Sequence, residues 1–392
     1  MNRNTIRLNS VLILFFIANI LNTVFPKNMG AEGQQEFVYQ LSKYVYGFGL
    51  ILMLPSLMST RRYYFRYMQY MVFYIILHMI SAVLMDFEFD FAHYLKMIMV
   101  CSSFVFFEEM LSKTKLNKYL LIAFMLSVFI NVTYLVLISN HMEAAYETGD
   151  SGGGQSIANA IIYLLPLLFL KFEGKWASYL YLCGFFVVLI SLRRTAILAY
   201  LFCAPFVYSQ LKRNVSKRFI AVVVVVFGFL AWYVMTHYWT VIEMRWNATI
   251  TPSDAGYYGS NRTGWWMALI NNFFTSPQHW LQGFGLGQVA LHMAKAGFPY
   301  GHAHNDYIEV GYTFGVVGMI LWFGTIWKLY KLSKKKRFVR YAMIIRMGAL
   351  SYFLVAVFSG VTSNVQFICI AIFAAIIVSK RNITTNNFSQ RC

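Results

Sequence analysis

Hydrophobic residues run through this chain in long blocks that are separated by short polar stretches. Most of the blocks approach the roughly 20 residues that an α-helix needs to cross the hydrocarbon core of a bilayer. The pattern predicts an all-α polytopic membrane protein with about 12 transmembrane helices. Their expected positions are 8–24, 37–58, 68–85, 94–110, 119–139, 156–170, 177–192, 195–210, 219–238, 305–327, 342–358 and 364–379.

Charged residues divide between the two sides of this layout. Most of the 33 Lys and Arg residues fall in loops on one side, and all but three of the 15 Asp and Glu residues fall on or near the other, the exceptions being Glu108, Glu109 and Glu173. Short loops rich in Lys and Arg stay in the cytoplasm. We therefore expect both termini to be cytoplasmic. The net charge of +18 is then largely an orientation signal, and nucleic acid is not an expected partner.

The composition agrees with a membrane protein. Hydrophobic residues make up 59% of the chain and charged residues 12%, whereas soluble proteins carry about a quarter charged residues. We interpret residues 1–392 as a single integral membrane domain. The five cysteines show no CxxC spacing, so neither a disulfide framework nor a zinc site is indicated.

The longest polar stretch, residues 239–303, lies between the ninth and tenth blocks. We expect it to be an external, periplasmic-side segment with interfacial helices that forms part of the active site. Trp265, Trp266 and Phe273 recur there at helical spacing after Arg262, which predicts an amphipathic helix that begins at this arginine. Backbone N–H groups at a helix start favour an anion. The alternative is that Arg262 is an ordinary surface residue.

Arg193 and Arg194 stand at the outer turn between two short apolar blocks, opposite to the other basic pairs. Arginine close to the hydrocarbon is costly and is usually paired or functional. A guanidinium grips phosphate bidentately, so the pair is a candidate anion site. The alternative is that both side chains reach out to lipid headgroups.

The stretch from 301 to 318, GHAHNDYIEVGYTFGVVG, is the strongest candidate for a reaction centre. His302, His304 and Asp306 have the spacing HxHxD, so a metal site with His292 as another ligand is one interpretation. Proton transfer suits His304 better, because a neutral imidazole is available near pH 7. Asn305 and Asp306 are suited to cap the helix that follows.

Glycines occur at two places near this stretch. Gly311, Gly315 and Gly318 have the spacing of a close helix-packing face. GFGLG at 283–287 follows no β-strand and opens no βαβ unit, so it is not a nucleotide-binding fingerprint. We expect a tight glycine turn there.

Three motifs in order resemble the O-antigen polymerase and O-antigen ligase family of bacterial membrane glycosyltransferases. They are SLRRTAIL, then NRTGWW followed by GFGLG, then HAHNDYIEVGYTFGVVG, and together they cover roughly residues 190–325. The family often has a small residue before a single arginine, whereas this chain has Leu192 and Arg193. We assign the equivalent position to Arg194, which directly precedes Thr195.

The resemblance implies a multi-pass protein of the bacterial cytoplasmic (inner) membrane, with an active site that faces the periplasm or exterior. It implies a donor oligosaccharide on undecaprenyl diphosphate, an acceptor glycan, contact with membrane lipids, a chain-length regulator as an additional partner, and no cofactor. The implied roles are a catalytic base, His304; diphosphate-binding arginines, Arg194, Arg262 and Arg193; and supporting residues, Asn305, Asp306 and His302.

Chemical reasoning agrees with these roles. A diphosphate is a good leaving group that needs its charge neutralised, and a general base has to take the proton of the acceptor hydroxyl. A single displacement inverts the anomeric carbon and requires no metal.

Three functions remain open at this stage. A polymerase, which we favour, would use another lipid-linked repeat as acceptor, whereas a ligase would use lipid A core. A transporter or flippase for lipid-linked glycans should carry ionisable residues along a path through the bilayer. Here they gather at one outer face.

Overall fold

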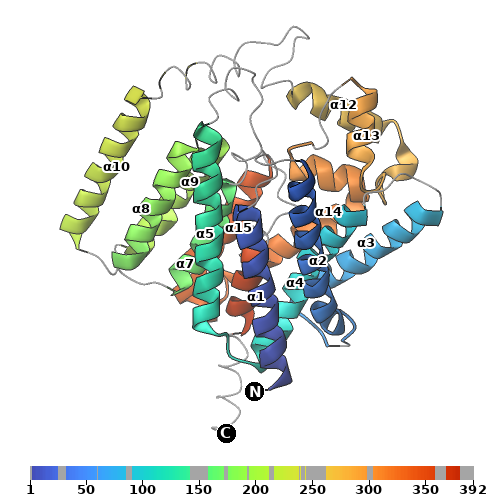
Figure 1. Ribbon diagram of the computed structural model, residues 1–392, viewed down its shortest axis with the longest axis horizontal. Helices are drawn as coiled ribbons and strands as arrows, with labels where there is room; N and C mark the ends of the chain where they lie inside the picture. The colour runs from blue at the N-terminus through green and yellow to red at the C-terminus, as the bar shows by residue number, and fades with distance from the viewer. Residues whose placement is uncertain are drawn as a thin grey trace.

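The computed structural model describes residues 2–24, 32–59, 61–84, 91–141, 158–171, 175–191, 194–211, 216–237, 239, 243, 262–297, 303–357 and 368–379. These residues form helices and turns and contain no β-strand (Figure 1). The helices are α1 (Arg3–Val24), α2 (Glu32–Leu57), α3 (Arg66–Leu84), α4 (Phe91–Lys113), α5 (Lys118–His141), α7 (Asn159–Lys171), α8 (Lys175–Ile190), α9 (Arg194–Leu211), α10 (Lys217–His237), α12 (Arg262–Phe274), η2 (Pro277–His279), α13 (Gln288–Lys295), α14 (Asp306–Leu332), η3 (Lys336–Tyr341) and α15 (Ala342–Ala356), followed by an apolar helix Ile368–Ser379.

Each apolar block predicted from the sequence coincides with one of these helices to within a few residues. Two helices among the described residues, Arg3–Leu21 and Asp306–Leu332, are long and apolar enough to cross a membrane. The other apolar helices are shorter. The all-helical class is therefore confirmed for the described part of the chain, while the number of spans and their orientation remain predictions.

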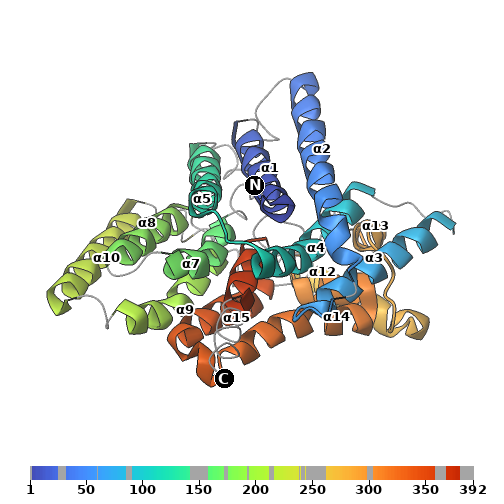
Figure 2. The ribbon, with the colours of Figure 1, turned by 90° about the horizontal axis from the view of Figure 1, so that it is seen from below.

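The helices pack around two buried elements. Residues 97–111 of α4 are all buried, and α4 packs against α2 and α3. The second element, α15, packs against α7, α9 and α14. Seen from the end where α1 begins, α14 runs along one side of the molecule, and α1, α2 and α5 stand on the other (Figure 2).

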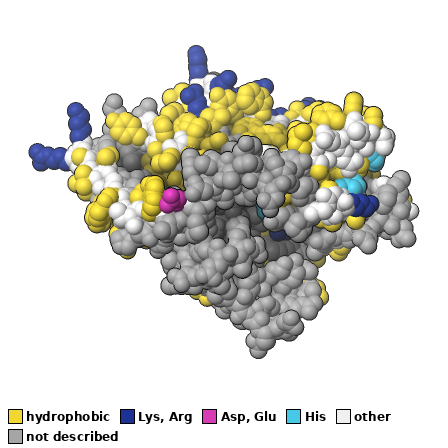
Figure 3. Space-filling model, turned by 90° about the horizontal axis from the view of Figure 1, so that it is seen from above, with side chains coloured by type: hydrophobic (Ala, Val, Ile, Leu, Met, Phe, Trp, Pro, Cys, Tyr) yellow, Lys and Arg dark blue, Asp and Glu magenta, His cyan; other side chains and the backbone are white. Residues whose placement is uncertain are grey.

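Much of the outer surface is apolar. Large hydrophobic side chains are exposed along several helices, including Leu77 on α3, Val225 on α10 and Ile320 on α14. Hydrophobic side chains dominate the described surface when it is viewed from above (Figure 3). Exposed apolar surface on this scale is typical of a protein whose helices face lipid.

The helix α14 is bent sharply at Gly315, whose φ is 62° and ψ is −164°. In an unbroken helix the N–H groups of Val316 and Val317 would donate to the carbonyls of Tyr312 and Thr313. Instead they donate to Trp280 O (2.9 Å) and Leu281 O (3.3 Å), while Phe284 N and Gly285 N donate to Tyr312 O (2.8 Å) and Thr313 O (2.9 Å). Residues 280–285 therefore provide partners for these four backbone groups that the bend sets free.

Two glycines make this exchange possible. A Cβ on Gly283 would lie 2.4 Å from the Thr313 carbonyl, and a Cβ on Gly315 would lie 2.4 Å from Leu281 O. Both glycines have positive φ. The tight turn expected at 283–287 is thus present, and its role is to close onto the broken helix.

The bend folds the two halves of α14 onto each other. The ring of Tyr307 stacks on that of Phe323 with centroids 4.5 Å apart. A Cβ on Gly311 would lie 3.0 Å from the sulfur of Met319. The predicted close packing at these glycines exists, but it joins two halves of one helix, and Gly315 is the bend itself.

Candidate functional site

The loop before α14 carries His304 in an unusual backbone conformation. Its φ is 52°, and it is the only non-glycine residue with positive φ in the described part of the chain. Such a conformation costs about 1–3 kcal/mol and is concentrated at functional sites. The imidazole is half-buried. A histidine held in this way is preorganised rather than free to swing on a loop.

Residues on both sides fix the turn at His304. Asn305 is the N-cap of α14, and its side-chain oxygen accepts from the N–H groups of Tyr307 (3.0 Å) and Ile308 (3.2 Å). Before the turn, the indole N–H of Trp266 donates to Ala303 O at 2.8 Å. The capping role predicted for Asn305 is confirmed.

The helix α12 forms one wall of this site. It begins at Arg262, as the spacing of its aromatic residues predicts. The ring of Trp265 lies 6.3 Å from that of His304. Arg262 stands one turn before Trp265, so the two residues lie on the same face of α12, the face that contacts His304. The side chain of Arg262 lies outside the described part of the structure.

Asp306 is buried rather than used as a cap. Its carboxylate is 0% exposed and accepts from the Tyr352 hydroxyl of α15 at 3.2 Å. That hydroxyl in turn accepts from the indole N–H of Trp322 at 2.6 Å. A buried carboxylate needs such donors. The chain from Trp322 through Tyr352 to Asp306 ties the start of α14 to α15 and to its own second half.

Arg194 is the first residue of α9, next to Thr195. The helices α8 and α9 are joined by a reciprocal pair, in which the Tyr200 hydroxyl donates to Tyr181 O at 2.6 Å and the Tyr181 hydroxyl donates to Tyr200 O at 3.2 Å. Their rings stack at 4.6 Å. The connection to His304 runs through α15, against which both α9 and α14 pack.

Two predicted site residues, Arg193 and His302, fall outside the described residues, as does the side chain of Arg194. The structure therefore brings His304, Asn305 and the start of α12 together. It describes no contact between Arg194 and this loop.

His292, the further metal ligand considered from the sequence, has a different partner. Its Nδ1 contacts the hydroxyl of Tyr312, which also accepts from the Asn272 amide at 2.6 Å. Burial lowers the pKa of His292, and the positive charge of Lys295 lowers it further. The imidazole is thus neutral near pH 7. Histidine side chains reach the surface over this region, at the right of Figure 3.

These aromatic residues form the core of a small unit that we call the α12–α13 cap, residues 262–297. Phe284 stacks between the rings of His279 (4.2 Å) and Tyr312 (4.5 Å). The buried members of its core are Trp265, Leu269, Val289, Met293, Ala303 and Tyr312. Because Ala303 and Tyr312 belong to this core, the cap positions the loop that carries His304.

Sequence reasoning missed several positioning residues, namely Trp266, Tyr312, Trp322 and Tyr352. Trp266 was interpreted as an interfacial side chain. Tyr352 lies 46 residues from Asp306, and a buried aromatic within an apolar block gives no local signal of a polar contact.

The family comparison covers the region that carries these residues. A family model described as O-antigen ligase matches residues 179–323, from within α8 to the second half of α14. No curated protein matches this chain. The matched segment contains all three motifs and every candidate site residue. The match supports a relation to the O-antigen polymerase and O-antigen ligase family, whose members are membrane glycosyltransferase-like enzymes.

Proposed function

We propose that this chain polymerises undecaprenyl-diphosphate-linked oligosaccharide repeats into an O-antigen or capsule-type polysaccharide. The reaction is a metal-independent, inverting glycosyl transfer at the outer face of the cytoplasmic membrane. The observation that carries the proposal is the turn at His304, which has a strained backbone and stands beside Trp265, a residue that lies one helical turn after the start of α12 at Arg262.

The proposed mechanism gives each residue one task. His304 takes the proton from the acceptor hydroxyl as its oxygen attacks the anomeric carbon of the donor. The bond between that carbon and the diphosphate oxygen breaks, and the electron pair leaves with the diphosphate. Arg194 and Arg262, with Arg193 beside them, neutralise the charge that grows on this leaving group. Trp265, whose ring lies 6.3 Å from the imidazole, and Trp266, whose indole N–H donates to Ala303 O, keep the base in place.

The same proposal assigns the membrane layout. The α12–α13 cap lies on the periplasmic or exterior side and forms part of the active site, and both termini lie in the cytoplasm. In Figure 1 the cap stands at the upper end of the molecule, whereas α1 begins at the lower end. This arrangement fits an active site that receives donor and acceptor from the outer leaflet.

A ligase is the second candidate, because the matching family model, described as O-antigen ligase, supports the polymerase and ligase family without separating the two. The chemistry at His304 is the same for both, because only the acceptor differs: another lipid-linked repeat for a polymerase, lipid A core for a ligase. No described residue separates the two acceptors.

Reconstitution of the purified protein tests the proposal. The protein is placed in vesicles with a mixed pool of undecaprenyl-diphosphate-linked oligosaccharides and EDTA, and the glycan products are sized. We expect a ladder of repeats. Transfer only after lipid A core is added would establish a ligase instead. No transfer to any acceptor, together with movement of the lipid-linked glycan between leaflets, would overturn glycosyl transfer in favour of transport.

A further inference from the structure

Two segments far apart in the sequence meet at the end of the molecule opposite the cap. They are the residues that lead into α3 and the last turns of α14. The Tyr64 hydroxyl donates to Lys328 O at 3.1 Å, and the Lys328 ammonium donates to Tyr64 O at 3.5 Å. The same ammonium lies 3.6 Å from the centre of the Tyr67 ring. The folded chain thus fixes the two segments against each other.

Both segments are strongly basic. The surface that they form, which we call the basic–aromatic surface, comprises Arg66, Lys328, Lys331, Lys334 and Lys335 with Tyr64, Tyr67, Trp327 and Tyr330. Lys331, Lys334 and Lys335 are exposed. Bringing like charges together is unfavourable unless an anion offsets them.

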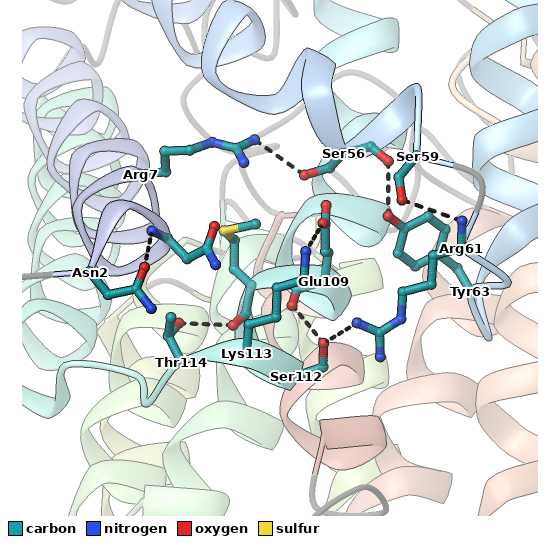
Figure 4. A network of polar contacts seen from close by, with 12 residues as sticks. Asn2, Arg7, Ser56, Ser59, Arg61, Tyr63, Glu109, Ser112, Lys113 and Thr114 are labelled. Atoms are coloured by element: carbon teal, nitrogen blue, oxygen red, sulfur yellow. Dashed lines mark hydrogen bonds and ion pairs between the residues drawn. The ribbon is translucent and has the colours of Figure 1, made fainter.

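Two carboxylates lie nearby; the charge of Glu108 offsets part of that of Lys328, and both carboxylates are held by other partners. Both oxygens of Glu108 accept backbone N–H groups, from Tyr64 at 2.6 Å and from Phe65 at 3.0 Å. Glu109 pairs with Lys113, beside the contact between Arg61 and Ser112 (Figure 4). Among the described residues, Lys113 and Glu109 form the one salt bridge. After Glu309 the sequence contains no further Asp or Glu.

Aromatic rings hold the cations of this surface in place. Lys331 lies over Trp327 (5.8 Å), Lys334 over Tyr330 (5.4 Å), and Lys335 over Tyr64 (5.7 Å). Trp and Tyr prefer the headgroup level of a bilayer. The combination of rings and ammonium groups is therefore suited to a membrane interface rather than to open water.

An apolar stripe leads from the bend of α14 to these cations. Val316, Ile320 and Trp327 are exposed, and their spacing places them on one face of the second half of α14. Lys331 continues the same face one turn after Trp327. A face that is apolar along its length and cationic at its end matches an acyl chain joined to a phosphate, and a soluble phosphate would not need the stripe.

We propose that this face binds an anionic phospholipid of the cytoplasmic leaflet. Its phosphate lies among Lys331, Lys335 and Arg66, and an acyl chain lies along Val316 and Ile320. The site goes beyond glycosyl transfer and depends only on the orientation that places this end of the molecule at the cytoplasmic side.

Thermal melting of the purified full chain in neutral detergent tests this proposal. The probes are phosphatidylglycerol, phosphatidylcholine and inorganic phosphate at equal phosphate concentration. We expect phosphatidylglycerol to raise the melting temperature most and inorganic phosphate to leave it unchanged. An equal shift with inorganic phosphate would overturn the lipid assignment, as would an equal shift with phosphatidylcholine.

Variants locate the site. In Lys331→Gln/Lys335→Gln we expect the apparent affinity for phosphatidylglycerol to fall by about 30-fold, because each cation removed should cost roughly fivefold. Lys217→Gln/Arg218→Gln removes the same charge from the exposed start of α10 and should leave the affinity within about twofold. Equal losses in both variants, or no loss in either, would overturn the site. Lys331→Arg/Lys335→Arg should keep the binding, which separates loss of charge from misfolding.

Discussion

The two halves of α14 differ in what holds them and in what they present. Before Gly315, residues 306–314 are held by hydrogen bonds to the α12–α13 cap and to α15, and they begin at the loop of His304. After Gly315, residues 316–332 pack against α3 and α15 and leave an apolar stripe that ends in cations. An apolar block that looks uniform in sequence thus divides into a half that carries the proposed site and a half that exposes an apolar stripe.

The largest effect should come from filling the bend. Gly315→Ala places a Cβ against Leu281 O, and the φ and ψ angles of Gly315 are ones that essentially only glycine adopts. We therefore expect a loss of more than about 3 kcal/mol in the free energy of unfolding. Gly228→Ala in α10, where a Cβ has open space, is the matched control and should be neutral or stabilising by up to about 1 kcal/mol. Melting in detergent measures both, and equal stability of the two variants would refute the exchange at the bend.

A smaller effect should follow from Tyr352→Phe. The variant removes the donor to the buried Asp306 carboxylate, and leaving that group without it should cost about 1–3 kcal/mol. Tyr208→Phe changes an exposed tyrosine of α9 and should shift stability by less than about 0.5 kcal/mol. If the two variants have the same melting temperature, the contact of Asp306 with α15 does not stabilise the first half of α14.

Removing the N-cap of α14 should have a still smaller effect on stability. Asn305→Ala deletes the acceptor for the N–H groups of Tyr307 and Ile308 and should cost about 1 kcal/mol. Asn305→Asp keeps an acceptor at the helix start and should retain most of the stability. Hydrogen exchange of the backbone amides in residues 306–310 measures the effect locally, in the first turn of α14. Unchanged exchange in the alanine variant would show that the cap does not hold this turn.

The smallest effect concerns the pH dependence of the stability that His292 contributes in the α12–α13 cap. Because the pKa of His292 is lowered in the folded protein, the unfolded chain binds more protons as the pH falls below about 6.5, the ordinary histidine value. Stability from this group is full above that pH and is lost as the pH falls towards the folded pKa. In His292→Asn the melting temperature should depend less on pH in this window. A dependence as steep as in the parent protein would assign it to another group.

Much of the helical framework followed from the sequence because apolar blocks and basic loops are local signals. The start of α12 at Arg262 and the cap at Asn305 were predicted for the same reason, since helix termini are set by a few adjacent residues. The motif around His304 led to the candidate site directly.

Features that depend on contacts between distant residues could not be predicted from the sequence. The bend at Gly315 depends on hydrogen bonds to backbone groups of residues 280–285, which are distant in the sequence. The spacing of Gly311, Gly315 and Gly318 is also compatible with a helix-packing face, so it does not indicate a bend. The contact between Asp306 and Tyr352 joins different helices. The left-handed turn at His304 could not be predicted either, because only a few per cent of non-glycine residues adopt positive φ, even though histidine is enriched among them.

The most direct test of the account is the activity of His304→Gln in the reconstituted vesicles, beside Arg218→Gln as a control for handling and insertion. If His304 takes the acceptor proton, its variant should insert at normal levels and transfer glycan at least about 100-fold more slowly, whereas the control should match the parent protein. Transfer by His304→Gln at the parent rate would contradict the proposed centre.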